Sequence, residues 1–180
     1  MKLRKGSQDA TGLTFGIVAS KFNKFVTSRL LTECVKALTK AGVTDEAIEV
    51  GRVPGAFEIP LVARQLARSG RFDAVICLGA VIRGDTPHFE YISTEVSRGI
   101  LQASMDSNIP VIFGVLTTDT VAQAIERADP EKLNRGADVA KTAIEMVNVM
   151  RLLKKEGSGE APQPATPSRR AGRSAARPKR

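Results

Sequence analysis

Short apolar runs alternate with segments of helical period between residues 12 and 156. The apolar runs are Leu13–Ala19, Ala47–Val53, Ala74–Gly79 and Val111–Leu116. They are nearly continuous, which is typical of parallel strands covered on both faces. Strands that alternate with helices form βαβ units, and the fixed hand of their crossovers favours a doubly wound sheet. The pattern predicts an α/β three-layer sandwich: a four-stranded parallel sheet in the order 2-1-3-4 with helices on both faces.

Each predicted strand is followed by apolar positions at helical spacing. Helices are expected at Val26–Ala41, Phe57–Ser69, His88–Ser107, Val121–Ala128 and Asn134–Lys155. Asp129 and Pro130 predict a break between the last two helices, because the residue before a proline avoids helical backbone angles. Ligands of such sheets bind outside the carboxyl ends of the strands, so the segments after residues 19, 53, 79 and 116 are where a site is expected.

Composition fixes the broad class. The chain has 180 residues, 42% of them hydrophobic, which is enough for one domain with a substantial core. No apolar run approaches the roughly 20 residues of a membrane-spanning helix, and the basic N-terminus lacks the apolar stretch of an export signal. We therefore expect a cytoplasmic protein in which Cys34 and Cys77 are buried free thiols. One histidine and two separated cysteines cannot form a structural zinc site.

The net charge is distributed unevenly. Of the total of +8, residues 157–180 carry +5, and this segment is rich in Pro, Ala, Ser and Gly. Such a composition cannot bury enough apolar surface to offset the entropy of ordering. We predict a flexible N-terminal arm at residues 1–11, one folded domain at 12–156 and a disordered basic tail at 157–180. The tail is either a passive solvated extension or a weak binder of polyanions or cargo.

The loops after the first two predicted strands contain candidate ligand contacts. Phe22 interrupts a polar loop, where it could stack on a planar heterocycle or fold back into the core. Gly55 allows close approach of the backbone to a ligand, and Glu58 falls in the first turn of the next helix. Glu58 either complements the helix dipole or accepts hydrogen bonds from a polyhydroxylated substrate, and its spacing fits both.

The segment from Gly79 to His88 leads directly into a predicted helix. Asp85 or Thr86 is a good N-cap residue and is followed by a proline, so the helix start is strongly encoded. The backbone amides of Gly84, Asp85 and Thr86, together with the positive end of the helix, predict an anion cradle that suits phosphate.

His88 and Arg127 are the candidate catalytic side chains. A lone histidine is often structural, but His88 lies beside the predicted cradle, and imidazole exchanges protons readily near neutral pH. A helix N-terminus also disfavours the charged imidazolium, which leaves a neutral base. Arg127 could hold a phosphate bidentately, or it could be a solvated helix residue that pairs with Glu126 or Asp129.

Five blocks of the chain, taken in order, resemble the lumazine synthase family of riboflavin biosynthesis. They are Phe22-Asn23, Val53–Pro60, Gly79–Tyr91, Phe113–Thr117 and Ala124–Ala128. The resemblance covers about residues 12–154. It implies a flavodoxin-like fold and a transferase that condenses 5-amino-6-(ribitylamino)uracil with 3,4-dihydroxy-2-butanone 4-phosphate to give 6,7-dimethyl-8-ribityllumazine. No metal or redox cofactor is expected.

The resemblance also implies roles for individual positions. Residues expected to bind the ribitylaminouracil are Phe22, Asn23, Ala56, Phe57, Glu58, Ala80, Val81, Ile82 and Phe113. The amides of Asp85 and Thr86 and the side chain of Arg127 are expected to hold the phosphate of the second substrate, while His88 moves protons. Arg135 stands where many relatives have a lysine that contacts substrate.

Members of this family are homopentamers that share each active site between adjacent subunits, and some assemble into icosahedral shells of sixty subunits. Residues 128–135 differ from the usual family turn, and this segment helps to decide between pentamer and shell, so both states stay open. A non-catalytic flavin-binding, lumazine-binding or container protein on the same scaffold is the alternative function, against which the retained His88 and Arg127 argue. Other flavodoxin-like classes are disfavoured: the strand ends lack the acidic cluster of a response regulator and the Ser/Thr-rich phosphate loop of a flavodoxin.

Overall fold

The computed structural model describes the backbone of residues 1–157 and the side chains to residue 154. The predicted basic tail lies outside the described residues from residue 158 onward. Within the described part, no helix is long and apolar enough to cross a membrane. The proposed division of the chain at residues 11 and 156 stays a prediction.

The described residues form one parallel sheet with helices between its strands. The strands are β1 (Phe15–Ser20), β2 (Ile48–Val53), β3 (Ala74–Ile82) and β4 (Val111–Thr118). Their order is β2-β1-β3-β4, which confirms the predicted topology. The helices are α1 (Lys24–Lys40), α2 (Ile59–Arg68), α3 (His88–Ser107), α4 (Val121–Ala128) and α5 (Arg135–Gly157), and a 3-10 turn, η1 (Asp45–Ala47), precedes β2.

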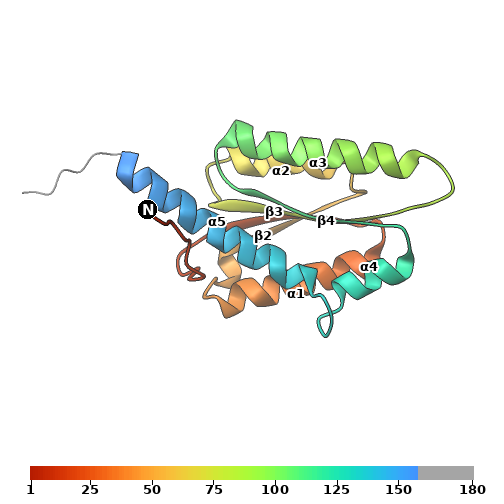
Figure 1. The fold of residues 1–180 in the computed structure, drawn as a ribbon, viewed down its shortest axis with the longest axis horizontal. Helices are drawn as coiled ribbons and strands as arrows, with labels where there is room; N and C mark the ends of the chain where they lie inside the picture. The colour runs from red at the N-terminus through yellow and green to blue at the C-terminus, as the bar shows by residue number, and fades with distance from the viewer. Residues whose placement is uncertain (158–180) are drawn as a thin grey trace, which may run out of the picture.

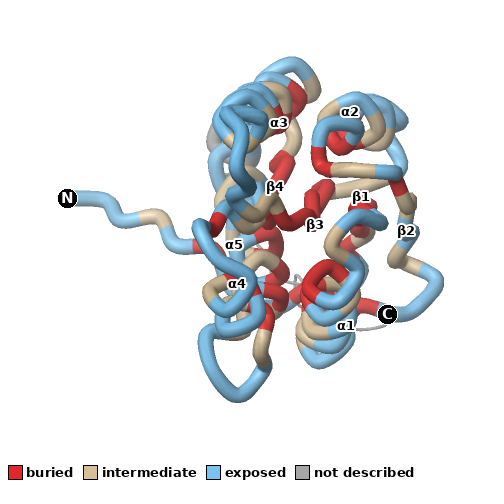
Figure 2. The backbone as a smooth tube through the Cα atoms, turned by 90° about the vertical axis from the view of Figure 1, so that its right-hand side faces the viewer, coloured by how far each residue is buried: buried red, intermediate tan, exposed pale blue. Residues whose placement is uncertain are grey.

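The helices form two layers around the sheet: α2 and α3 cover one face, and α1, α4 and α5 cover the other (Figure 1). Successive residues of β1 point to opposite faces, so Ile17 joins the core beneath α1 and α5 while Val18 joins the core beneath α2 and α3. Burial is concentrated along the sheet and the inner faces of the helices (Figure 2). The continuous apolar runs of the central strands therefore reflect two cores that share one sheet.

Both cysteines are free and buried, as predicted, Cys34 in α1 and Cys77 in β3. Burial disfavours the charged thiolate and raises the pKa of Cys34 to about 12. Burial also raises the pKa of Cys77 far above its ordinary value. Both thiols therefore stay protonated and act as small apolar groups in the two cores.

The helix α3 begins at His88, as predicted, but the residue at its N-cap differs from the sequence-based expectation. The strand β3 continues to Ile82 because its last residues pair with Thr117 and Thr118 of β4, so the connecting turn is short. The N-cap position is Pro87, and neither Asp85 nor Thr86 caps the helix with its side chain. The φ angle of −64° at Pro87 is already suitable for helix entry, so the helix begins without a side-chain cap.

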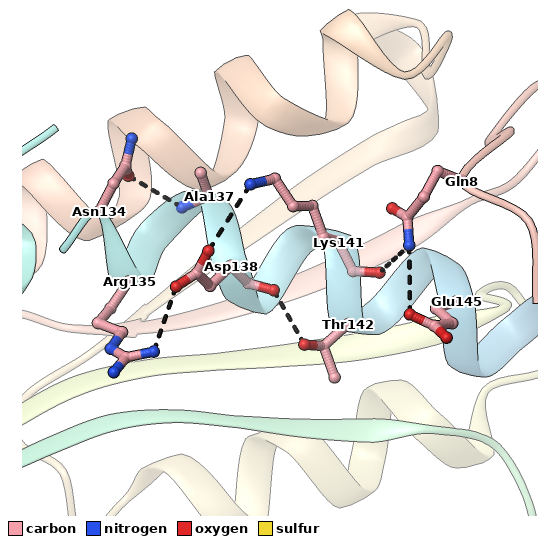
Figure 3. Close-up of polar contacts among 8 residues, drawn as sticks. All are labelled: Gln8, Asn134, Arg135, Ala137, Asp138, Lys141, Thr142 and Glu145. Atoms are coloured by element: carbon pink, nitrogen blue, oxygen red, sulfur yellow. Dashed lines mark hydrogen bonds and ion pairs between the residues drawn. The ribbon is translucent and has the colours of Figure 1, made fainter.

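The predicted break after α4 is confirmed. Asp129 has extended backbone angles, and α5 starts after Asn134, whose side chain accepts a hydrogen bond from the amide of Ala137 (Figure 3). Near its other end, α5 binds the N-terminal segment: the Asn148 amide donates to the carbonyls of Ser7 and Asp9, both at 3.0 Å.

Candidate active site

A cavity of about 690 Å³ lies at the carboxyl ends of β1, β2 and β3. The chain leaves β1 toward β2 and leaves β3 toward β4, in opposite directions across the sheet, so the cavity occupies the topological switch point. Most of the sequence-predicted site residues line it, namely Phe22, Asn23, Ala56, Phe57, Glu58, Ala80, Val81, Ile82, Thr86 and His88. The fold therefore brings residues from three separate loops to one place.

The loops after β1 and β2 are held together by backbone hydrogen bonds. The amide of Lys21 donates to the carbonyl of Val53 at 2.7 Å, and the amide of Phe22 donates to that of Pro54 at 3.0 Å. These bonds extend the pairing of β1 and β2 past the strand ends. Phe22 is 69% exposed and Phe57 is 57% exposed, so the alternative in which Phe22 packs into the core is wrong. Two aromatic rings thus stand uncovered beside the cavity.

Asn23 links the first loop to β3. Its backbone is left-handed, with φ 55° and ψ 44°, a conformation that asparagine tolerates better than most residues. Its side-chain amide donates to the carbonyl of Ala80 at 2.9 Å. One N–H of this amide thus holds the cavity wall, which leaves the second N–H and the oxygen for a ligand.

Glu58 is the N-cap residue of α2 and borders the cavity. Its Oε2 accepts a hydrogen bond from the amide of Gly55 at 2.9 Å, which turns the carboxylate back over its own loop. A carboxylate can accept about four hydrogen bonds, so the remaining lone pairs are suited to hydroxyl donors. The arrangement is compatible with both interpretations of Glu58, and its role in binding stays a prediction.

The turn between β3 and α3 is the place at which an anion cradle was predicted. The amide of Arg83 donates to the carbonyl of Thr118 at 2.9 Å and anchors the turn to β4. The amides of Gly84, Asp85 and Thr86 make no hydrogen bond within the described residues. Free amides near a helix N-terminus attract anions. Gly84 and Thr86 line the cavity, whereas Asp85 does not.

His88 is the first residue of α3, exposed and part of the cavity wall. Phe89 and Ile92 also line the cavity, and sequence reasoning did not include them. A signal for them exists: Ile92, Val96 and Ile100 recur at helical spacing, and continuing this stripe one turn back leads to the beginning of α3. The first turn of α3 thus contributes both the candidate base and apolar wall.

Besides Asp85, three predicted site residues lie outside this cavity. Phe113 is on β4, where it pairs with Cys77, four positions before Val81 along β3, and it is 43% exposed. Arg127, in the last turn of α4, donates to the carbonyl of Gln123 at 3.3 Å. Arg135 pairs with Asp138 on its own helix at 3.2 Å (Figure 3). A single chain therefore brings His88 together with the rings of Phe22 and Phe57. It does not bring Phe113 or the two arginines to the same cavity.

An open parallel α/β sheet with a cavity at its switch point defines a class: flavodoxin-like proteins that bind ligands at the carboxyl ends of their strands. The family model described as 6,7-dimethyl-8-ribityllumazine synthase matches residues 12–151. The chain is also 60% identical over 147 residues to a 6,7-dimethyl-8-ribityllumazine synthase of Syntrophus aciditrophicus (strain SB), an alignment that covers 82% of this chain and 96% of the relative. The chain belongs to the 6,7-dimethyl-8-ribityllumazine synthase family.

Proposed function

We propose that this chain catalyses the condensation of 5-amino-6-(ribitylamino)uracil with 3,4-dihydroxy-2-butanone 4-phosphate, giving 6,7-dimethyl-8-ribityllumazine, phosphate and water. Membership of the family supports the reaction. The observation that carries the proposal into this chain is the cavity that joins an exposed ring, a carboxylate and a histidine at one switch point. The reaction needs two substrates to be positioned and protons to be moved, and these groups supply both functions.

The cavity suggests a place for each substrate. Phe22 stacks on the flat pyrimidinedione, because aromatic faces suit planar rings. Glu58 accepts hydrogen bonds from the ribityl hydroxyls. The amides of Asp85 and Thr86 hold the phosphate at the other end. His88, at the start of α3, carries protons as the amine attacks the ketone, water leaves to form the imine, and phosphate is eliminated.

Magnitudes indicate how much His88 contributes. Good positioning of two reactants supplies roughly 7–11 kcal/mol of the barrier. One general acid–base supplies about 10²–10⁴-fold in rate. Most of the acceleration thus comes from positioning, and we expect His88→Ala to slow the reaction without silencing it. Loss of a group that grips the phosphate should be more damaging, because it disturbs both binding and orientation.

We infer that an adjacent copy of the chain completes each site in a homopentamer. The family resemblance implies this sharing. The positions of Phe113 and Arg127, on β4 and α4 and outside the chain's own cavity, are compatible with it. Phe113 would close the far wall over the pyrimidinedione, and Arg127 would reach the phosphate. Arg135 would contact substrate in the same manner, and pentamers could assemble further into a sixty-subunit shell.

The test is lumazine formation by the purified full chain, followed by absorbance, together with its native mass. We expect turnover in the wild type, loss of turnover in Arg127→Ala and a milder defect in His88→Ala. Arg71→Ala is the matched control and should keep full activity, because it removes an exposed guanidinium at the amino ends of the strands, opposite the cavity. Binding of the ribitylaminouracil without turnover would favour the non-catalytic alternative, and binding of neither substrate would refute both.

Mixing the two variants tests the sharing of sites. If His88 and Arg127 of one site come from different subunits, pentamers assembled from equal amounts of His88→Ala and Arg127→Ala chains contain intact sites at about one quarter of their interfaces. Co-refolded mixtures should then recover about a quarter of the wild-type activity. Activity no greater than the mean of the separate variants would show that both residues act within one chain.

A further inference from the structure

Arg83 joins three segments at the phosphate end of the cavity. Its Nε donates to Asp119 Oδ1 at 2.7 Å, and its Nη1 donates to Glu90. Its guanidinium lies over the ring of Phe89, 4.2 Å from the centroid, while its backbone amide binds the carbonyl of Thr118. One side chain thus connects the turn after β3, the first turn of α3 and the end of β4.

These contacts are too exposed to be explained by stability. The side chains of Arg83, Glu90 and Asp119 are 42%, 51% and 65% exposed. Ion pairs with that much exposure contribute little to folding, because water and salt screen them. We therefore relate this cluster of one guanidinium and two carboxylates to the ligand that the turn between β3 and α3 binds.

The two carboxylates matter because of their location. Glu90 is two residues past His88 in the first turn of α3, and Asp119 directly follows the end of β4, whose Thr118 anchors the turn. Hydrogen bonds to Asp119 and then to Glu90 raise the pKa of Arg83, and Arg83 lowers the pKa of Glu90. Without the guanidinium, two negative charges would face the place where a phosphate has to bind.

We propose that Arg83 is a positioning residue for the phosphate-bearing substrate, which partly offsets the charges of Glu90 and Asp119 and holds the first turn of α3 against the end of β4. This role rests on the proposed function, because it assumes that the amides of Asp85 and Thr86 receive the phosphate. It extends that function to a residue that the family resemblance did not assign. Arg83 acts through the turn and touches neither reacting atom.

The size of the effect follows from Coulomb's law with screening. A carboxylate about one Debye length from a phosphate dianion, about 8 Å at physiological salt, weakens its binding about twofold in a water-like dielectric. The single charge of Arg83 balances one of the two carboxylates, so its loss adds one net negative charge and weakens phosphate binding about twofold. At about 0.01 M salt the Debye length is about 30 Å, screening nearly disappears, and the same charge weakens phosphate binding about fourfold.

The experiment compares three variants of the full chain by steady-state kinetics at about 0.15 M and about 0.01 M salt. In Arg83→Met, the KM for the phosphate-bearing substrate should rise about twofold at the higher salt and about fourfold at the lower salt. The KM for the ribitylaminouracil and the kcat should not change at either salt. Arg83→Lys keeps the charge and should retain a near wild-type KM. Combining Arg83→Met with Glu90→Gln and Asp119→Asn leaves no net charge at this place, where the wild type has −1, and should bring the KM for the phosphate-bearing substrate to the wild-type value or below it.

Arg71→Met is the matched control. Arg71 also pairs with an exposed carboxylate, Glu49, and lies over the ring of Phe72, 4.7 Å from its centroid. It does so at the amino ends of the strands, opposite the cavity. Its loss should leave both KM values unchanged, while circular dichroism and native mass check that all variants fold and assemble. A triple variant no better than Arg83→Met, or an equal rise of both KM values, would overturn the role in charge balance.

Inorganic phosphate separates this role from the proposed function. It should compete with the phosphate-bearing substrate in the wild type, and its inhibition constant should rise in Arg83→Met by the same factor as the KM. If phosphate does not compete in the wild type, the proposed phosphate end is wrong and the role of Arg83 is overturned with it. If phosphate competes equally in the wild type and in Arg83→Met, only the role of Arg83 is wrong.

Discussion

Asn23 is the position at which one substitution should separate two physical effects. Its side chain donates to the carbonyl of Ala80 at 2.9 Å, and its backbone is left-handed at φ 55°. Asn23→Ala removes the hydrogen bond, which costs about 1 kcal/mol, and places alanine in a left-handed conformation, which costs a further 1–2 kcal/mol or so. We expect alanine to destabilise the fold by about 2–3 kcal/mol.

Asn23→Gly is the matched comparison. Glycine loses the same hydrogen bond to Ala80 but adopts the left-handed conformation at no steric cost. Its added freedom in the unfolded chain costs up to about 1 kcal/mol, so the glycine variant should lose about 1–2 kcal/mol in total. The alanine variant should therefore be the less stable of the two, although alanine is the better helix former.

Thermal unfolding at one fixed protein concentration measures both variants, since the melting temperature of an oligomer depends on concentration. For a chain of this length 1 kcal/mol corresponds to about 2–4 °C, so the alanine variant should melt roughly 4–12 °C below the wild type. A glycine variant that melts at or below the alanine variant would refute the argument from backbone conformation. A change under about 1 °C in both would show that the bond to Ala80 contributes nothing.

Two further predictions concern the core. Burial raises the folded-state pKa of Cys34 to about 12 from an unfolded value near 9.0. The free energy of unfolding that this thiol contributes is therefore complete below pH 9 and is lost as pH rises toward 12. The loss between pH 8 and pH 10.5 amounts to about 2 kcal/mol, and Cys34→Ala should remove it from the pH dependence of unfolding. Gly136→Ala would place a Cβ 2.5 Å from the carbonyl oxygen of Leu30 and push α5 away from α1. Thermal unfolding should show a loss of stability of about 1–3 kcal/mol. Gly51→Ala is the control and should be nearly neutral, because its Cβ would have its nearest contact at 3.7 Å.

The strands of the sheet were predictable because burial on both faces leaves a clear trace in the sequence, and their order followed from the fixed hand of the βαβ crossovers. Runs such as the one from Ala74 to Gly79 are apolar at every position, which only a strand covered on both sides requires. The same run continues through Ala80, Val81 and Ile82, so the sequence carried the signal for the whole of β3 and the predicted end at Gly79 was too early. The missing cap at Asp85 was not predictable in this way, because a residue suited to capping does not by itself determine which position of the turn precedes the helix.

The candidate site was predicted to the extent that it follows from topology. Phe22, Glu58 and His88 directly follow strand ends, so the rule that ligands bind at those ends located all three. Arg83 could not be assigned from the sequence, because its partners Glu90 and Asp119 meet only after β3 and β4 have paired. Local sequence patterns indicate where a helix or strand begins. They do not show which charged residues of other segments, such as Asp119, lie beside a given side chain after folding.

The two ends of the cavity are held by different kinds of interaction, and this difference determines how each responds to change. The ring end depends on backbone pairing past the strand ends and on the bond from Asn23 to Ala80, neither of which salt screens appreciably. The proposed phosphate end depends on exposed charges around Arg83, which contribute little to folding but affect the local potential. Substitutions at the ring end should therefore appear first as lost stability, and substitutions at the phosphate end as lost affinity that deepens as salt is removed. A substitution of Arg83 that lowered the melting temperature as much as Asn23→Ala would contradict this division.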